Sequence, residues 1–181
     1  MESHQDNERE VVEAACGGDA EAMAGLYERY YAVMVWVAYS VLLDRGLAED
    51  AAQQAFATAC EKMHGLRRLD RFGPWLTRIC RNAAIDMARN RRHDAVLRRD
   101  AEGRMCASPG CNGFDSAVKD AVDALAPMYR EVVVLHYYNR MSYREIQGVL
   151  GISADTVKGR LARARKRMQT HLKRNGFNRE Q

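Results

Sequence analysis

The sequence predicts an all-α fold made of two small helical domains, and three observations support this prediction. Apolar residues recur at spacings of three and four, and no stretch alternates as a half-buried strand does. Ala, Arg, Leu, Glu and Met, which all favour helix, are frequent. The three prolines, Pro74, Pro109 and Pro127, each stand at a break in the apolar pattern. The hydrophobic share of 47% is enough for packed cores, so an ordered chain is expected.

The first 93 residues are expected to hold four helices and a basic loop. The helices are predicted at 8–16, about 20–43, about 47–64 and about 74–91, with the loop at 66–73. Asp19 is a predicted N-cap, because an Asp side chain accepts the free N–H groups of a first turn. Gly46 and Gly65 are expected to bound the third helix, and Pro74 suits the first turn of the fourth. The apolar stripe expected to be buried in that fourth helix is Trp75, Ile79, Ala83 and Met87.

A change of composition separates the second domain from the first. The chain is divided into an acidic segment 1–18, a first domain 19–93, a linker 94–115, a second domain 116–173 and a tail 174–181. The linker is predicted to be flexible, because Gly, Ser, Pro and Asn cluster in CASPGCNG and the periodicity fades there. In the second domain, helices are predicted from Ser116 to Leu125, from Pro127 to about Tyr138, from the capping box Ser142-Tyr-Arg-Glu145 to Gly151, and over about 154–173 after Ser153.

Residues 142–168, SYREIQGVLGISADTVKGRLARARKRM, have the arrangement of a helix-turn-helix. The apolar positions expected to fix the angle between its two helices are Ile146, Val149, Leu150, Ile152, Val157, Leu161 and Ala164. The residues expected to face DNA are Ser153, Asp155, Thr156, Lys158, Arg160 and Arg163, with Arg165, Lys166 and Arg167 neutralising phosphates. The alternative is a solvated basic helix end. The capping box, the turn glycine and eight bases without an acid over 158–174 favour the helix-turn-helix.

A second basic region, residues 67–92, interleaves aromatic and basic side chains. Its candidate nucleic-acid contacts are Arg67, Arg68, Arg71, Phe72, Trp75, Arg78, Arg81 and Asn82. Aromatic faces stack on unpaired bases while arginines follow the backbone, which is typical of single-strand binding. A loop ending at Phe72 is a candidate pocket for an extruded base. The alternative is that Phe72 and Trp75 are core residues.

The helix predicted at 47–64 has an Ala-rich face and a polar one. The polar face carries Glu49, Asp50, Gln53 and Gln54, with Phe56 near its edge. An aromatic residue beside polar side chains indicates a candidate protein interface. An ordinary amphipathic helix is the alternative.

The cysteines and the N-terminus favour a cytoplasmic protein without a metal or cofactor. The acidic N-terminus lacks the basic start and apolar block of a secretory signal, and five cysteines without framework spacing fit a reducing compartment. No apolar run approaches the ~18–20 residues of a membrane span, so no membrane insertion is expected. No His follows closely after Cys106 and Cys111, so no metal site is expected there, while a redox role stays open. Cys16, Cys60 and Cys80 are expected to be small core residues.

Three blocks together resemble a bacterial RNA polymerase sigma factor of the extracytoplasmic-function type. They are AEDAAQQAFATACEKMHGL, RFGPWLTRICRNAAIDMARNRRH and LAPMYREVVVLHYYNRMSYREIQGVLGISADTVKGRLARARKRM. The resemblance covers about 19–93 and 116–172, which are identified as sigma regions two and four. It implies a factor that binds core RNA polymerase, directs it to promoters by reading −10 and −35 elements, and assists strand opening.

The resemblance also implies roles and partners. The residues that would bind core polymerase are Asp50, Gln53, Gln54 and Phe56. Those that would read the −10 element are the loop Arg67–Phe72 and Trp75, Arg78, Arg81, Asn82 and Asp86. The helix-turn-helix would read the −35 element. The implied partners are core RNA polymerase, promoter DNA in duplex and single-stranded form, and an anti-sigma factor. Two positions depart from the family's pattern: Gln147 stands where a small Ala is preferred, and Gly159 stands where Ser is common.

Two other classes of protein compete with this interpretation of the sequence. An enzyme is disfavoured, because the five His residues are isolated and no glycine-rich phosphate loop follows a strand. A helix-turn-helix regulator that binds duplex DNA unaided, with 19–93 as a sensor or dimerisation domain, explains the C-terminal domain. It does not explain the aromatic and basic residues at 67–92.

Overall fold

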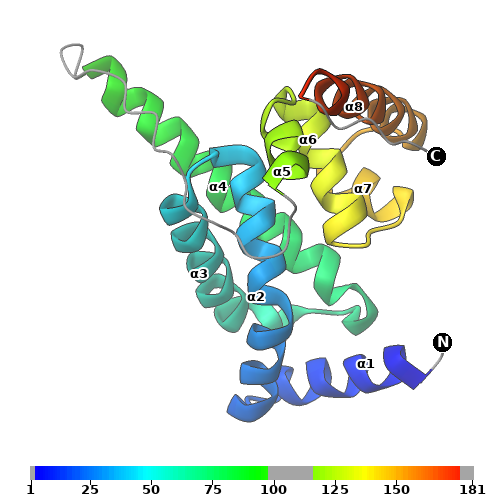
Figure 1. The fold of residues 1–181 in the computed structure, drawn as a ribbon. Coiled ribbons are helices and arrows are strands. Elements are labelled where there is room, and N and C mark those ends of the chain that lie inside the picture. The colour runs from blue at the N-terminus through cyan, green and yellow to red at the C-terminus, as the bar shows by residue number, and fades with distance from the viewer. Residues whose placement is uncertain (1–2, 98–115, 176–181) are drawn as a thin grey trace. The chain divides into compact units, whose positions relative to one another are not determined.

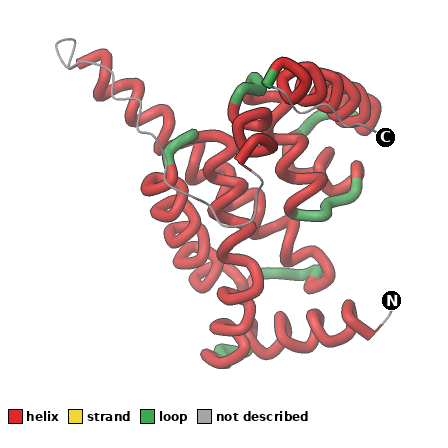
Figure 2. Tube along the Cα trace, in the orientation of Figure 1, coloured by secondary structure: helices red, strands yellow, loops and turns green. Residues whose placement is uncertain are grey.

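A computed structural model describes residues 3–97 and 116–175, and every regular element in those ranges is a helix (Figure 1). The chain divides into two compact units, Met1–Arg99 and Asp100–Gln181, which are described separately below. Short loops join the helices within each unit, as Figure 2 shows. The predicted all-α class with two helical domains is confirmed.

Unit 1 is a helical bundle built on three long helices. Its elements are α1 (Ser3–Cys16), α2 (Ala20–Leu42), α3 (Arg45–Lys62), the 3₁₀ turns η1 (Met63–Gly65) and η2 (Leu69–Arg71), and α4 (Phe72–Leu97). Helices α2, α3 and α4 pack on one another, while α1 packs against α2 and both 3₁₀ turns. The acidic N-terminal segment is therefore part of the first folded unit from α1 onward.

Side-chain caps set where α2 and α3 begin. The Asp19 carboxylate accepts the backbone N–H groups of Glu21 and Ala22 at 2.8 and 3.1 Å, as predicted. Asp44 caps α3 by accepting the N–H of Leu47 at 3.2 Å. Because that cap starts α3 at Arg45, Gly46 lies inside the helix, and the prediction that Gly46 bounds it is wrong.

Small residues on α3 allow the bundle to pack closely. Five alanines of α3 are completely buried: Ala48, Ala51, Ala52, Ala55 and Ala59. They face a core that includes Leu26, Met34 and Val37 of α2. Since alanine side chains are short, they allow the backbones of the packed helices to come close together.

The buried stripe of α4 differs from the predicted one. Phe72, Leu76, Cys80 and Ala84 are all 0% exposed, whereas Trp75, Ile79, Ala83 and Met87 are only half-buried. Both stripes are apolar and each keeps a spacing of four, so periodicity alone cannot choose between them. The start of α4 at Phe72 turns the first stripe toward α2 and α3. The prediction placed the core one residue too early in each turn.

Helix α4 also runs past its expected end. It continues to Leu97, because neither Gly nor Pro occurs between Pro74 and that residue and the Arg-rich stretch favours helix. Residues 94–97 are therefore helical rather than part of the predicted linker. The rest of that linker, with Cys106 and Cys111, and most of the predicted tail lie outside the described residues.

Cysteine placement agrees with the prediction at one position and disagrees at another. Cys80 is buried, its thiol donates to the Met34 carbonyl at 3.3 Å, and burial raises its pKa to about 12. Cys16 is half-buried. Cys60 is exposed, so the expectation of a core residue is wrong there, because one residue past the buried Ala59 turns it about 100° from the core.

Unit 2 is a compact set of short helices closed by one long helix. Its elements are α5 (Ser116–Asp123), α6 (Pro127–Val133), the π-helical turn η3 (Val134–Tyr138), α7 (Tyr143–Leu150) and α8 (Ala154–Arg174). Pro127 opens α6, as predicted. Arg130 is 4% exposed and donates to the carbonyls of Val122, Asp123 and Leu125 at 3.3, 3.1 and 2.7 Å. It thereby satisfies backbone acceptors at the end of α5.

Candidate nucleic-acid interfaces

Three local features at the helix ends define the helix-turn-helix. Ser142 and Glu145 form the predicted capping box: the Glu145 carboxylate accepts the Ser142 N–H at 2.8 Å, and the Ser142 hydroxyl accepts the Glu145 N–H at 3.4 Å. Gly151 ends α7 with φ of 67°, the left-handed conformation that glycine adopts without a steric penalty. Ser153 caps α8 by accepting the Thr156 N–H at 3.2 Å.

Apolar side chains fix the two helices against each other. Of the seven predicted positions, Ile146, Val149, Val157, Leu161 and Ala164 are buried, and Leu150 and Ile152 are half-buried. Gln147 is exposed, so its long side chain points outward. Open space surrounds Gly159, where an added Cβ would meet no atom within 4 Å. Neither departure from the family's pattern therefore disturbs the packing of α7 on α8.

The N-terminal half of α8 presents an exposed polar and basic face. Asp155, Thr156, Lys158 and Arg163 are exposed, and Arg160 is half-buried. The hydroxyls of Ser153 and Thr156 lie 2.8 Å apart, which orients both at the start of the helix.

The next turn of α8 is also basic. Arg165, Lys166 and Arg167 are exposed, and the Arg167 guanidinium lies 4.8 Å from the centre of the Tyr129 ring. No carboxylate of the described residues forms an ion pair with the basic residues of α8. Such a surface attracts phosphates, because no carboxylate in the described part of the unit pairs with its positive charges.

The second candidate surface begins in the basic loop of unit 1. Arg67, Arg68 and Arg71 are exposed around η2. Asp70 lies between them and pairs with Arg68 at 2.9 Å and Arg71 at 3.5 Å. The hydrogen bond from Arg68, with the positive charges of both arginines, lowers the pKa of Asp70. This carboxylate stays charged and orders the loop, and it offsets one of the three basic charges.

Phe72 does not take the predicted place in a base pocket. It is 0% exposed, and its ring meets Tyr30 edge-on at 5.5 Å. The reason is that Phe72 starts α4 instead of ending a loop, so its side chain enters the bundle. The expectation that its ring is available for stacking is wrong in this conformation, and the core alternative holds.

Trp75, in contrast to Phe72, is half-buried and keeps part of its surface accessible. Its ring packs on Phe72 with ring centres 5.9 Å apart. At 100° per residue, Trp75, Arg78 and Asn82 share an arc of about 60° on α4. Arg78 and Asn82 are exposed and Arg81 is half-buried. One helix face thus combines an aromatic ring with a guanidinium and an amide, the combination that binds unpaired bases and their backbone.

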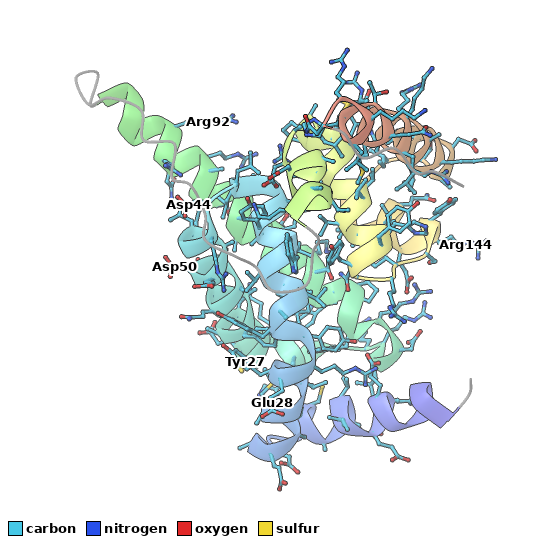
Figure 3. The ribbon with its side chains drawn as sticks, viewed as in Figure 1. Tyr27, Glu28, Asp44, Asp50, Arg92 and Arg144 are labelled. Atoms are coloured by element: carbon cyan, nitrogen blue, oxygen red, sulfur yellow. The ribbon has the colours of Figure 1, made fainter. Side chains whose placement is uncertain are left out.

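The candidate protein interface on α3 is only partly as predicted. Asp50, Gln53 and Gln54 are exposed, and Figure 3 shows Asp50 pointing away from the helix. Phe56 is 4% exposed and packs against Tyr27 at 4.7 Å, so it supports the surface from below and does not lie on it. The alanines beside Phe56 on α3 are small, so they leave room for its ring to turn toward the core.

Sequence reasoning missed the aromatic pair above Phe56. Tyr27 of α2 is 37% exposed and stacks on Tyr31 with ring centres 4.8 Å apart (Figure 3). Partial desolvation, with Tyr31 beside it, raises the pKa of Tyr27. The signal was present in LYERYY, where aromatic residues repeat along the polar side of a helix. The face near α3 is therefore both aromatic and polar.

Within the described residues, no three His, Cys, Asp or Glu side chains come together as a metal site. No helix in residues 3–97 or 116–175 has the length and apolar character that a membrane crossing requires.

Each of the two units matches the model of a known protein family. Residues 26–93 match the model of Sigma-70 region 2, and residues 115–168 match that of Sigma-70, region 4. The first match covers α3, the basic loop and most of α2 and α4. The second covers unit 2 through the basic part of α8.

Similar proteins agree with these matches. The ECF RNA polymerase sigma factor SigW of Bacillus subtilis is 30% identical over 175 residues, which cover 86% of this chain and 91% of SigW. SigM of the same species is 28% identical, covering 80% of this chain and 91% of SigM. The chain resembles the solved structure of CnrH bound to the cytosolic domain of CnrY, with a TM-score of 0.69, 27% identity and coverage of 93% and 99%.

A second solved structure shares the fold. RpoE of Bartonella quintana, solved with the anti-sigma factor NepR, has a TM-score of 0.72 and 24% identity, covering 83% of this chain and 96% of RpoE. The region matches, the identity to SigW over nearly its whole length, and the helix-turn-helix of unit 2 lead to one conclusion. The chain belongs to the ECF RNA polymerase sigma factors, the promoter-recognising factors of transcription initiation.

Proposed function

We propose that the two units divide promoter recognition between duplex and single-stranded DNA. The observation that carries this proposal is the presence on one chain of a capped helix-turn-helix and a separate α4 face on which a half-buried Trp75 lies with the exposed Arg78 and Asn82. The first kind of surface reads paired DNA and the second binds unpaired bases.

Unit 2 is the proposed reader of the −35 element. The N-terminal residues of α8 enter the major groove, where Thr156, Lys158 and Arg160 reach base edges. Arg163, Arg165 and Lys166 contact phosphates, which fixes the position of the helix on the duplex. At the start of α8, Ser153 and Asp155 also contact the DNA, at the edge of the groove.

Unit 1 is the proposed reader of the −10 element. Trp75 stacks on a base freed from the duplex, Arg78 and Asn82 contact it or its neighbours, and Arg67, Arg68 and Arg71 follow the backbone. Arg81 and Asp86 flank this face. The surface favours the open promoter only by its greater affinity for unpaired than for paired DNA. Phe72 supports the site from the core.

The exposed part of α3 is the proposed docking face for core RNA polymerase. Asp50, Gln53 and Gln54 supply the polar contacts. We add Tyr27 to this face, because an exposed Tyr supplies a large apolar contact area together with a hydroxyl. Phe56 holds Tyr27 in place from below.

The proposed partners include a protein inhibitor. RpoE of Bartonella quintana was solved with an anti-sigma factor, and CnrH with the cytosolic domain of another protein. We expect an anti-sigma factor to bind the polymerase- and DNA-binding faces of this chain. We expect the protein to act in the cytoplasm, where RNA polymerase works, without a cofactor or a catalytic group of its own.

Transcription with purified core polymerase tests the proposal. Core enzyme mixed with this protein is expected to start RNA chains at defined sites on DNA, and core enzyme alone is not. Failure to associate with core polymerase or to initiate at any defined site would refute the proposal. Repression or activation of an already complete polymerase would instead identify a helix-turn-helix regulator.

A further inference from the structure

Helix α1 is fastened to the rest of unit 1 at two points. Glu8 accepts a hydrogen bond from the Tyr30 hydroxyl through Oε1 and pairs with Arg29 through Oε2 at 2.8 Å. At the C-terminal end of α1, the carbonyl of Cys16 accepts a hydrogen bond from the His64 ring at 2.8 Å. Between these points Val12 is completely buried. Helix α1 therefore has a fixed position beside η2, against which it packs.

The Tyr30 ring joins α1 to the first turn of α4. Its hydroxyl is held by Glu8, and its edge contacts Phe72. Gly73 is buried against the same ring: an added Cβ would lie 3.1 Å from the Tyr30 hydroxyl oxygen and 3.3 Å from Cε1. The ring thus occupies the space of a side chain at position 73. Because the Tyr30 ring lies this close to Gly73, a movement of the α4 start toward the ring must displace the ring.

The coupling continues to the surface that is proposed to bind unpaired bases. Phe72 packs on Trp75, so the Tyr30 ring and Trp75 are both in contact with Phe72. On its N-terminal side, the first turn of α4 directly follows η2, around which Arg67, Arg68 and Arg71 lie. Movement of the first turn of α4 would change how Trp75 and the basic loop are presented together.

We propose that Glu8 and Tyr30 are positioning residues for −10 recognition, which hold the first turn of α4 so that Trp75 and the arginines of η2 act on the same unpaired segment. This inference rests on the proposed −10 role of unit 1. It assigns a function to α1, which lies outside the residues that match Sigma-70 region 2. Neither residue touches DNA; both act through Phe72 and Gly73.

Two substitutions test the contact from opposite sides. Tyr30→Phe removes only the hydroxyl, and Gly73→Ala pushes on the ring from α4. The assay uses the full chain with core polymerase and a fork DNA whose −10 strand is unpaired, taken from a promoter that the wild-type holoenzyme selects from random DNA. We expect Tyr30→Phe to weaken fork binding about fivefold, the factor that corresponds to one hydrogen bond. Gly73→Ala should weaken it by more.

Association with core polymerase and binding of −35 duplex by either variant should stay within about twofold of wild type. The −35 contacts belong to unit 2, and the docking residues are Asp50, Gln53 and Gln54 of α3 with Tyr27 of α2, whose ring packs on Tyr31 and Phe56. Gly25→Ala is the matched control on α2, because a Cβ there meets no atom within 4 Å. Adding Glu8→Gln to Tyr30→Phe should produce little further loss of fork binding, because the Tyr30 contact is already gone and the remaining ion pair of Glu8 with Arg29 is partly exposed and contributes little.

Two results would overturn the inference while leaving the proposed function intact. One is fork binding by Tyr30→Phe and Gly73→Ala equal to that of wild type. The other is a parallel loss of polymerase association, which would mark a general structural role. A wild-type holoenzyme that opens no promoter would overturn the proposed function, and this inference with it.

Discussion

Phe72 and Trp75 stand three residues apart at the start of α4, and their surroundings give them different roles. Phe72 is completely buried between Tyr30 and Trp75, so it contributes to the stability of unit 1. Trp75 is only half-buried and shares a face with Arg78 and Asn82. At the scale of single residues, exposure separates the side chains that hold the fold from those available to DNA.

Phe72→Ala is expected to destabilise unit 1 rather than to act on DNA alone. Removing a fully buried ring costs about 3–5 kcal/mol, because apolar burial is lost and a cavity remains. Denaturant unfolding followed by circular dichroism measures the change in the free energy of unfolding. Trp75→Ala is the comparison and should cost clearly less. A Phe72→Ala variant as stable as wild type would contradict the placement of Phe72 in the core.

Arg160→Ala and Arg165→Ala should weaken −35 binding in different ways. If Arg160 reads a base, its loss costs about 1–3 kcal/mol and relaxes the sequence preference at one position. Arg165 is proposed to contact a phosphate. Its loss should therefore weaken the binding of all DNA sequences alike, and it should reduce by about one the slope of the logarithm of the binding constant against the logarithm of the salt concentration. Titration of duplex DNA at several salt concentrations distinguishes the two. The assignment fails if the two variants behave alike.

At the scale of elements, unit 2 depends on polar groups at helix ends. The capping box at Ser142 starts α7, and Gly151 ends it. Arg130 donates from inside the core to two carbonyl groups at the end of α5, those of Val122 and Asp123, and to the Leu125 carbonyl just beyond it. The caps at Ser142, Gly151 and Ser153 fix the ends of α7 and α8, so the proposed reading helix is formed within unit 2 itself.

Arg130→Ala is expected to destabilise unit 2 by about 3 kcal/mol or more, because buried carbonyl groups lose their donors. Loss of helical circular dichroism at a lower denaturant concentration would report it. Arg144→Ala is the matched control: Arg144 is exposed on α7, where Figure 3 shows it pointing outward. Equal stability of the two variants would mean that Arg130 does not support α5.

Local signals in the sequence predicted the helix ends better than the buried faces. Asp19, Ser142 and Gly151 act on their own neighbours in the chain, so their roles follow from residue type and spacing. The buried side of α4 depends on how three helices meet, and two apolar stripes competed for it. Phe56 and Phe72 were expected at surfaces because they stand beside polar residues, yet contacts with α2 bury both.

At the scale of the whole molecule, the two units are proposed to divide promoter recognition. In this proposal, unit 2 binds paired DNA through α8 and unit 1 binds bases that become unpaired. Neither needs an energy source, because capture shifts the equilibrium toward the open promoter by differential affinity. The net charge of +4 is small, and it is the local concentration of basic residues on each unit that serves binding.

The most direct measurement compares promoter opening with −35 protection in a Trp75→Ala holoenzyme. Permanganate reactivity of unpaired thymines reports opening at the −10 element, and footprinting reports protection at −35. The account predicts that Trp75→Ala loses most of the thymine reactivity and keeps the −35 footprint. Wild-type reactivity in the variant, or loss of both signals together, would contradict a separate single-strand reader on α4.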